Sequence, residues 1–178
     1  SGIDTFSTMC ISRVPSLSAK KLDPKQLALL LANPATTNPL FLLVALEELR
    51  GFGAYEQVSA RIAAFPQGVA DPIGALFGQV IERLRDEFDP DVVRMILALI
   101  ASSRSGMSQR ELLEMIEGIG VETSNGELFY ILRQLRPYLQ YRGALLDFFH
   151  RGLYNAVREW YLPDEDCALP YHADLADY

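Results

Sequence analysis

The chain has 178 residues, of which 49% are apolar and 22% are charged, a composition typical of globular proteins and not of disordered or fibrous ones. Sixteen basic and 23 acidic side chains give a net charge of −7, and an acidic chain repels the phosphates of nucleic acids. These values predict one medium-sized folded domain or two small ones, with no nucleic acid as a partner.

The two cysteines, Cys10 and Cys167, lie near opposite ends of the chain and have no CxxC spacing. So few cysteines at this spacing are typical of proteins of the reducing cytoplasm, and they predict neither a disulfide scaffold nor a thiolate metal site. The longest apolar stretch, near residues 27–31, is far shorter than the roughly 20 residues that cross a bilayer. The start resembles no signal peptide and lacks Met, so we expect a cytoplasmic piece of a larger protein that does not bind membranes.

Four helices are predicted in the first half of the chain, after an arm or linker rich in Ser, Thr and Pro. Asp23 before Pro24, with Gln26 three residues after the cap, is a strong helix start. Asn38-Pro39 starts another helix, whose apolar residues nearly encircle it and so indicate burial among other helices. The arm covers residues 1–22, and the helices, which form a helical domain over residues 23–89, cover residues 23–32, 38–50, 54–65 and 72–88.

The pattern changes after Pro90 to three helices followed by a hairpin. Ser108 with Glu111, and Ser124 with Glu127, have the spacing of capping boxes at the starts of the second and third helices. Two apolar segments then flank a pair of residues suited to a tight hairpin turn. The expected elements are helices over residues 91–102, 108–117, 124–136 and 149–161, with strands at 138–141 and 144–148 around Arg142-Gly143.

The predicted fold is therefore mainly α, with two parts. A helical bundle is followed by a winged-helix domain with a small β-hairpin wing, which we place at residues 90–163. Residues 164–178 are expected to start a further helical, repeat-like region, in which the acidic run Asp164-Glu165-Asp166 is a solvated helix start and His172 has a structural role.

Motifs that would mark an enzyme are absent from the sequence. It has no GxxxxGK[ST] phosphate loop, no HExxH zinc motif and no GxSxG nucleophile elbow. The glycine pairs Gly51/Gly53 and Gly118/Gly120 do not continue into GxGxxG and are better explained as helix ends. The sequence predicts no catalytic residues, no metal site and no enzyme activity for this chain.

A winged helix can bind DNA, because its third helix can enter the major groove. The corresponding helix here, over residues 125–136, carries Arg133 and Arg136 among several apolar residues and Glu127. Arg142 is the single basic residue of the wing. For this helix, a role in protein packing is therefore favoured over DNA binding.

Several segments together resemble the signal-transducing NTPases with numerous domains, specifically the NACHT-like branch of telomerase-associated and nephrocystin-type proteins. The resemblance covers about residues 20–178, and the order and spacing of its segments carry it. The matching segments are residues 22–27, 38–42, 47–53, 103–108, 111–113, 135–139, 146–150, 161–162 and 172–178.

The resemblance implies a role in a nucleotide-dependent switch. In such proteins this region follows a Walker-type core and forms a helical lid and a winged helix, before C-terminal repeats. It implies that the parent protein is an ATPase, that ATP or ADP with Mg is its cofactor, and that this chain alone holds no nucleotide tightly. The implied partners are the nucleotide-binding core of the same chain, further copies of the parent in a homo-oligomer, and proteins bound by the C-terminal repeats.

The resemblance also implies two nucleotide-binding residues. Pro39, after Asn38, matches the Pro that lies against adenine, although a Pro at this point also simply starts a helix. His150 matches the His of a Met-His-Asp-like motif that reaches the β-phosphate of ADP in the closed state. Here Phe149 stands in place of Met and Arg151 in place of Asp, so Arg151 either attracts phosphate or faces solvent. A capping role for His150 between strand and helix is the alternative interpretation.

Two other functions remain open from the sequence. A free-standing helical adaptor would bind proteins through exposed apolar surface, and a winged-helix DNA-binding module is the third interpretation. Exposed apolar surface around Pro39 would favour a lid that has lost its partner, whereas an independent adaptor should bury it.

Overall fold

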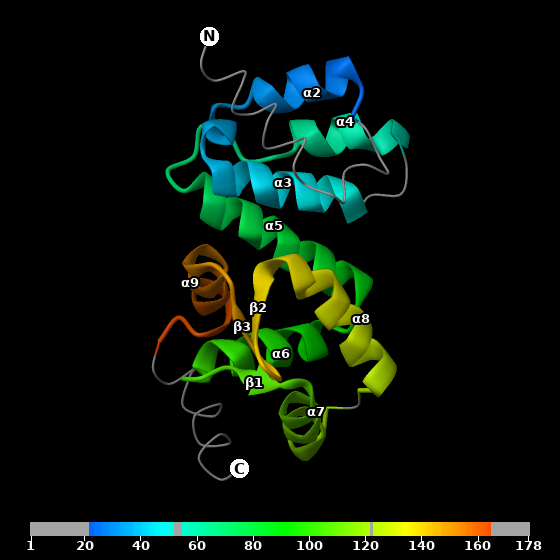
Figure 1. The fold of residues 1–178 in the computed structure, drawn as a ribbon, viewed down its shortest axis with the longest axis vertical. Coiled ribbons are helices and arrows are strands. Elements are labelled where there is room, and N and C mark those ends of the chain that lie inside the picture. The colour runs from blue at the N-terminus through cyan, green and yellow to red at the C-terminus, as the bar shows by residue number, and fades with distance from the viewer. Residues whose placement is uncertain (1–21, 52–54, 122, 165–178) are drawn as a thin grey trace. The chain divides into compact units, whose positions relative to one another are not determined.

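The computed structural model describes residues 22–51, 55–121 and 123–164. These residues form eight α-helices, two short 3-10 helices and one three-stranded antiparallel sheet, which confirms the prediction of a mainly helical fold (Figure 1). No helix within them is both long and apolar enough to cross a bilayer. The arm before Leu22, both cysteines, His172 and the helix expected at the C-terminus lie outside the described residues.

The chain divides into two compact units between Leu76 and Phe77. The sequence places the domain boundary later, at Pro90, where the composition changes. The division falls earlier because most of α5 packs within the second unit, where Phe77 meets Tyr138 edge-to-face at 5.9 Å between ring centroids.

The first unit consists of short helices joined by tight connections. Asp23 forms the predicted capping box, because its carboxylate accepts from the Gln26 N–H at 2.7 Å while the Gln26 amide oxygen accepts from the Asp23 N–H. Asn33 follows α2 and caps η2, and its buried side chain also donates to the Pro66 carbonyl at 3.0 Å. The elements are α2 (Pro24–Leu31), the 3-10 helix η2 (Pro34–Thr37), α3 (Pro39–Gly51), α4 (Tyr55–Ala63) and the start of α5 (Pro72–Glu87).

The core of the first unit is largely apolar but also encloses an ion pair. Phe41 and Phe65 pack edge-to-face with 6.5 Å between ring centroids. Glu48 is only 2% exposed, and its carboxylate lies 3.2 Å from the guanidinium of Arg61 on α4. A buried carboxylate is costly unless it is paired and hydrogen-bonded, so this contact ties α3 to α4.

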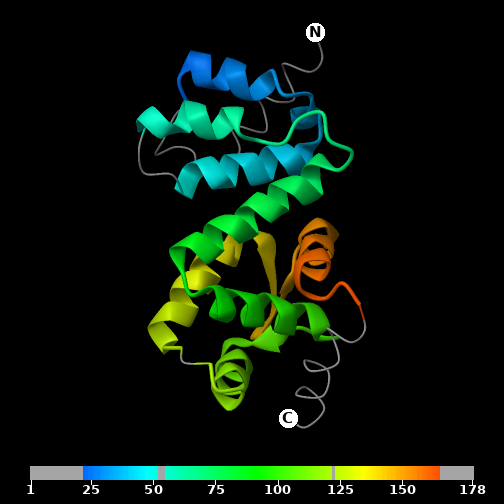
Figure 2. The same ribbon diagram turned by 180° about the vertical axis from the view of Figure 1, so that it is seen from behind.

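The second unit contains the sheet, which has the strand order β1-β3-β2. Helix α6 lies across one face of the sheet, behind the strands in Figure 1 and in front of them in Figure 2. Nine of the thirteen residues of α6 are buried, so this helix is the centre of the core. The elements after α5 are α6 (Pro90–Ser102), β1 (Met107–Ser108), α7 (Gln109–Gly118), α8 (Asn125–Leu135), the 3-10 helix η3 (Arg136–Tyr138), β2 (Leu139–Arg142), β3 (Leu145–Phe148) and α9 (Arg151–Tyr161).

The predicted hairpin is confirmed, with the turn one residue later than expected. Arg142 pairs with Leu145, so Gly143 and Ala144 form the two-residue loop. Gly143 has φ +65°, the left-handed conformation that a type II′ turn requires at this position and that glycine adopts without strain.

Strand β1 was not predicted from the sequence. Its two residues, Met107 and Ser108, pair with Leu146 and Leu145 of β3. Gly106, just before β1, has φ +85°, and a β-carbon there would lie 2.5 Å from the Leu146 carbonyl oxygen. The backbone therefore approaches β3 closely enough that glycine is required before the strand.

The capping boxes of the second unit are only partly as predicted. Ser108 and Glu111 form theirs completely at the start of α7. At the start of α8 the Ser124 hydroxyl accepts from the Glu127 N–H at 3.1 Å, but the Glu127 carboxylate does not return the bond. It accepts instead from the Asp89 N–H at 3.4 Å, which joins the starts of α6 and α8.

Candidate functional site

His150 lies at the junction between β3 and α9, where it caps the helix. Its backbone is extended, and its Nδ1 accepts from the Gly152 N–H at 2.9 Å. Because Nδ1 accepts, it is the unprotonated nitrogen, and the neutral ring carries its hydrogen on Nε2. The cap therefore fixes the tautomer. Because the side chain is exposed, its Nε2–H is available as a donor on the surface.

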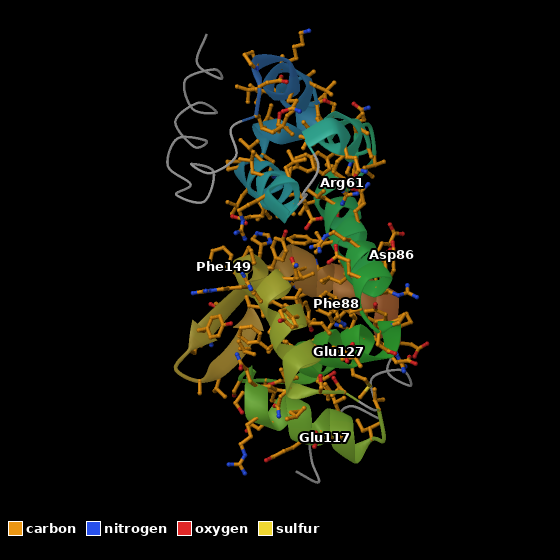
Figure 3. All side chains as sticks on the ribbon, turned by 90° about the vertical axis from the view of Figure 1, so that its right-hand side faces the viewer. Arg61, Asp86, Phe88, Glu117, Glu127 and Phe149 are labelled. Atoms are coloured by element: carbon orange, nitrogen blue, oxygen red, sulfur yellow. The ribbon has the colours of Figure 1, made fainter. Side chains whose placement is uncertain are left out.

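The surroundings of His150 are aromatic and basic. Phe149 is 59% exposed, and its N–H donates to the Tyr138 carbonyl at 2.9 Å (Figure 3). That bond joins the end of β3 to η3, which begins at the exposed Arg136. Arg151 is the exposed first residue of α9, and neither arginine forms an ion pair within the described residues. This end of the second unit therefore offers positive charge beside the Nε2–H donor.

Pro39 is the first residue of α3, as predicted. The Asn38 side-chain oxygen accepts from the Leu40 N–H at 2.9 Å, in the manner of a helix cap. Both Asn38 and Pro39 are exposed, and one turn later Leu43 is 36% exposed. Pro39 and Leu43 thus form an exposed apolar strip on a helix whose other faces are largely buried.

The predicted residues belong to different units of the chain. Asn38 and Pro39 lie in the first unit, and His150 and Arg151 lie in the second. Among the described residues no group of three or more potential metal ligands comes together. The first unit carries an exposed apolar strip, and the second carries a hydrogen-bond donor with exposed arginines.

The apolar residues of the helix predicted over residues 125–136 divide between two faces in the structure. Leu128, Ile131 and Leu132 are buried, whereas Phe129 and Tyr130 are exposed. Ile131 and Leu132 follow Leu128 by three and four residues, which is the spacing of one helix face. This spacing is the sequence signal that identifies the core face of the helix. Phe129 and Tyr130 fall between these core positions, and the composition of the helix alone does not distinguish the two faces.

Comparison with known proteins finds a likeness to a repeat protein. No family model matches the chain, and no solved structure matches it. A TPR repeat-containing protein of Dictyostelium discoideum is 24% identical over 162 residues, which cover 89% of this chain. The match spans only 10% of the length of that relative. The chain is therefore similar to one stretch of a much longer repeat protein.

Proposed function

We propose that this chain is the lid and winged-helix part of a nucleotide-dependent signalling switch of the NACHT-like type. In this proposal the first unit is the lid, and the second unit is the winged helix that changes position between resting and active states. The chain regulates the reaction of an adjoining nucleotide-binding core and catalyses nothing by itself.

The observation that carries the proposal is the exposed strip of Pro39 and Leu43. A self-sufficient helical adaptor should bury apolar side chains at the start of a helix that is otherwise as buried as α3. A lid leaves them exposed when the core and its nucleotide are absent. Pro39 is also the residue that the family resemblance assigns to the adenine ring, so the exposed strip and the sequence motif coincide.

The order of elements in the second unit supports the winged-helix assignment. Helix α6, strand β1, helices α7 and α8, and the β2–β3 hairpin follow one another as in a winged helix, and the hairpin corresponds to the wing. Helix α8 would then be the third helix of the domain, and α9 would follow the wing.

His150 supplies the contact that distinguishes the two states. Its Nε2–H is a suitable donor to a phosphate oxygen of ADP, and Arg151 adds positive charge beside it. A ligand shifts a conformational equilibrium only through contacts that differ between the states. In this proposal the His150 contact exists in the resting state, and its loss upon exchange of ADP for ATP frees the second unit and permits oligomer assembly.

The likeness to a TPR repeat-containing protein supports the placement of this chain within a larger molecule. The matched stretch is a small part of that relative, whose name describes repeats. A switch of the proposed kind has repeats after its winged helix, through which it binds other proteins. In this proposal the Mg ion and the phosphate loop belong to the adjoining core.

Replacing His150 tests the proposal, provided that its cap and its phosphate contact are separated. In the full-length parent protein, His150→Asn keeps a side-chain cap but removes the Nε2–H donor, and we expect ADP to dissociate about tenfold faster. His150→Ala should release ADP equally fast and also lose about 1 kcal/mol of stability with the cap. The measurement is the release rate of a fluorescent ADP analogue by stopped flow.

The two variants also identify the alternative. If His150→Asn releases ADP at the rate of the native protein, the histidine is only a helix cap and its assigned role in the switch is wrong. A parent protein that binds no ADP at all would favour the second candidate function, a helical adaptor for protein binding. The exposed Phe129 and Tyr130 on α8 are the specific observation in favour of that adaptor.

A further inference from the structure

Helix α8 and the turn that continues it carry a face of two aromatic and two basic side chains. Phe129 and Tyr130 are 55% and 56% exposed, and their rings pack edge-to-face at 5.8 Å between centroids. Arg133 and Arg136 are also exposed, and they follow Phe129 by four and seven residues, so helical spacing places them on the same side. These four residues form the aromatic–arginine face. The buried residues of the helix lie on the opposite face: Leu128, Ile131, Leu132 and Leu135.

The two arginines of this face have no acidic partner. A helical arginine usually pairs with an acidic residue three or four positions away. The sequence has no Asp or Glu at either distance from Arg133 or Arg136, and neither arginine forms an ion pair within the described residues. Other helices of the second unit do contain such pairs: Arg83 with Glu87, Arg94 with Asp91, and Arg110 with Glu114.

The remaining acidic residue of α8 does not balance this charge. Glu127 is half-buried, and its carboxylate accepts from the Asp89 N–H and from the Thr123 hydroxyl, each at 3.4 Å. Arg133 and Arg136 also lie three residues apart, a spacing at which like charges repel. The positive charge of the face is therefore uncompensated within the described part of the second unit, and so is the exposure of the two rings.

We propose that the aromatic–arginine face binds an acidic, partly apolar segment of another protein. Apolar side chains of the segment cover the rings of Phe129 and Tyr130, and two of its carboxylates accept from the guanidinium groups of Arg133 and Arg136. Tyrosine and arginine are the residue types enriched at the energetic centres of protein interfaces. The helical rise between Phe129 and Arg136 is about 10 Å, so two turns of a partner helix are long enough to cover the face.

The composition of the face favours a protein segment over a nucleic acid. Nucleic acids owe most of their affinity to the neutralisation of many phosphates, and this face offers two arginines in a chain with a net charge of −7. A protein segment needs few carboxylates, because burial of the two rings contributes the rest of the binding free energy. The inference uses neither a nucleotide nor His150, so it and the proposed switch can fail independently.

Selection from a random peptide library displayed on phage tests the proposal. The bait is the immobilised chain, and a double variant with Phe129→Ala and Arg133→Glu first removes phage that bind elsewhere on its surface. We expect the selected peptides to be enriched in Asp and Glu beside large apolar residues. A selection that yields no peptides, or peptides without acidic residues, overturns the proposal.

Fluorescence anisotropy of one selected peptide, labelled with fluorescein, measures the contribution of each residue. Phe129→Ala and Arg133→Glu should each raise the Kd of the peptide about tenfold or more. The Kd for the native chain should also rise with salt concentration, because the charges are exposed.

An exchange of charges tests whether the arginines contact carboxylates. A peptide with Lys in place of its Asp and Glu residues should not bind the native chain. It should bind the double variant that carries Arg133→Glu and Arg136→Glu, in which the signs of both partners are reversed. If this exchanged pair does not bind, the assigned charge pairing is wrong.

Arg104→Glu is the matched control for the change of charge. Arg104 is exposed in the loop after α6 and forms no ion pair within the described residues. This variant should bind the selected peptide as tightly as the native chain does. Weaker binding by Arg104→Glu, equal to that of Arg133→Glu, would show that net charge alone controls the interaction and would overturn the proposal. Equal unfolding midpoints establish that all variants are folded.

Two other occupants of the face have outcomes of their own. Sedimentation velocity would reveal a second copy as a dimer of the native chain that Phe129→Ala dissociates. Anisotropy of labelled single-stranded and duplex DNA would reveal a nucleic acid, if Arg133→Glu abolishes its binding and the DNA binds more tightly than the selected peptide. Either result would assign the face to a different partner and overturn the proposal.

Discussion

Gly106→Ala should lower the free energy of unfolding by about 3 kcal/mol, an effect that the size of the added methyl group alone would not suggest. Gly106 has φ +85°, where a side chain is strained by roughly 1 to 2 kcal/mol. The added β-carbon would also lie 2.5 Å from the carbonyl oxygen of Leu146. That oxygen belongs to the backbone of β3, so it can move away only if the pairing of β1 with β3 is disturbed.

Gly120→Ala separates the two contributions. Gly120 has nearly the same conformation, φ +83°, but a β-carbon added there would have no atom within 4 Å of it. The free energy of unfolding of Gly120→Ala should therefore fall only by the cost of the backbone conformation, about 1 kcal/mol. Urea unfolding followed by circular dichroism measures both variants. Equal losses in the two would mean that the approach of Gly106 to β3 has no energetic importance.

Arg61→Met should destabilise the first unit by about 3 kcal/mol. The substitution keeps much of the apolar stem but removes the guanidinium that lies 3.2 Å from the Glu48 carboxylate. Because the Glu48 side chain is almost fully buried, water cannot replace this partner without a rearrangement of α3 and α4. The guanidinium also lies 5.6 Å from the centre of the Phe65 ring, and that contact is lost as well.

Two further variants define how much the ion pair of Glu48 and Arg61 contributes to stability. In the double variant Glu48→Met with Arg61→Met, neither charge is buried, and stability should return to within about 1 kcal/mol of the native chain. Arg110→Met removes an exposed pair with Glu114, at 2.7 Å, and should cost less than about 0.5 kcal/mol. If thermal unfolding shows Arg61→Met and Arg110→Met to be equally mild, burial does not make the Glu48 pair important.

The features that the sequence predicts well are local ones. The capping boxes at Asp23 and Ser108 and the helix start at Pro39 depend on residues within one turn of each other. Their hydrogen bonds need no partner from elsewhere in the chain, so the sequence alone can identify them. The turn at Gly143 belongs to the same class, although its position shifted by one residue because strand pairing sets the register.

The features that the sequence did not predict depend on distant partners. Strand β1 is two residues long and exists only because β3 lies beside it. The Glu127 carboxylate has the spacing for a capping box but bonds to Asp89, which lies 38 residues earlier in the chain. Spacing along the chain could not reveal either contact, because tertiary packing decides between bonds of similar strength.

The candidate site was predictable only in part for the same reason. Pro39 and His150 were identified by their resemblance to family motifs, and both cap or start a helix in the structure. The sequence did not reveal that Nδ1 of His150 forms the cap, nor that Arg136 lies near the same end through η3. Which apolar residues of α8 are exposed depends on how that helix packs and not on its composition.

The packing of α5 against α9 gives the chain an optical probe of its own. Trp160 on α9 is the single tryptophan of the sequence. Its indole lies close to Gly78 on α5, and the Arg85 guanidinium sits 5.7 Å from the centre of the ring. Separation of these helices would bring water to the indole and shift its fluorescence to longer wavelength. Conformational change in the second unit can therefore be followed in the native sequence, without an attached dye.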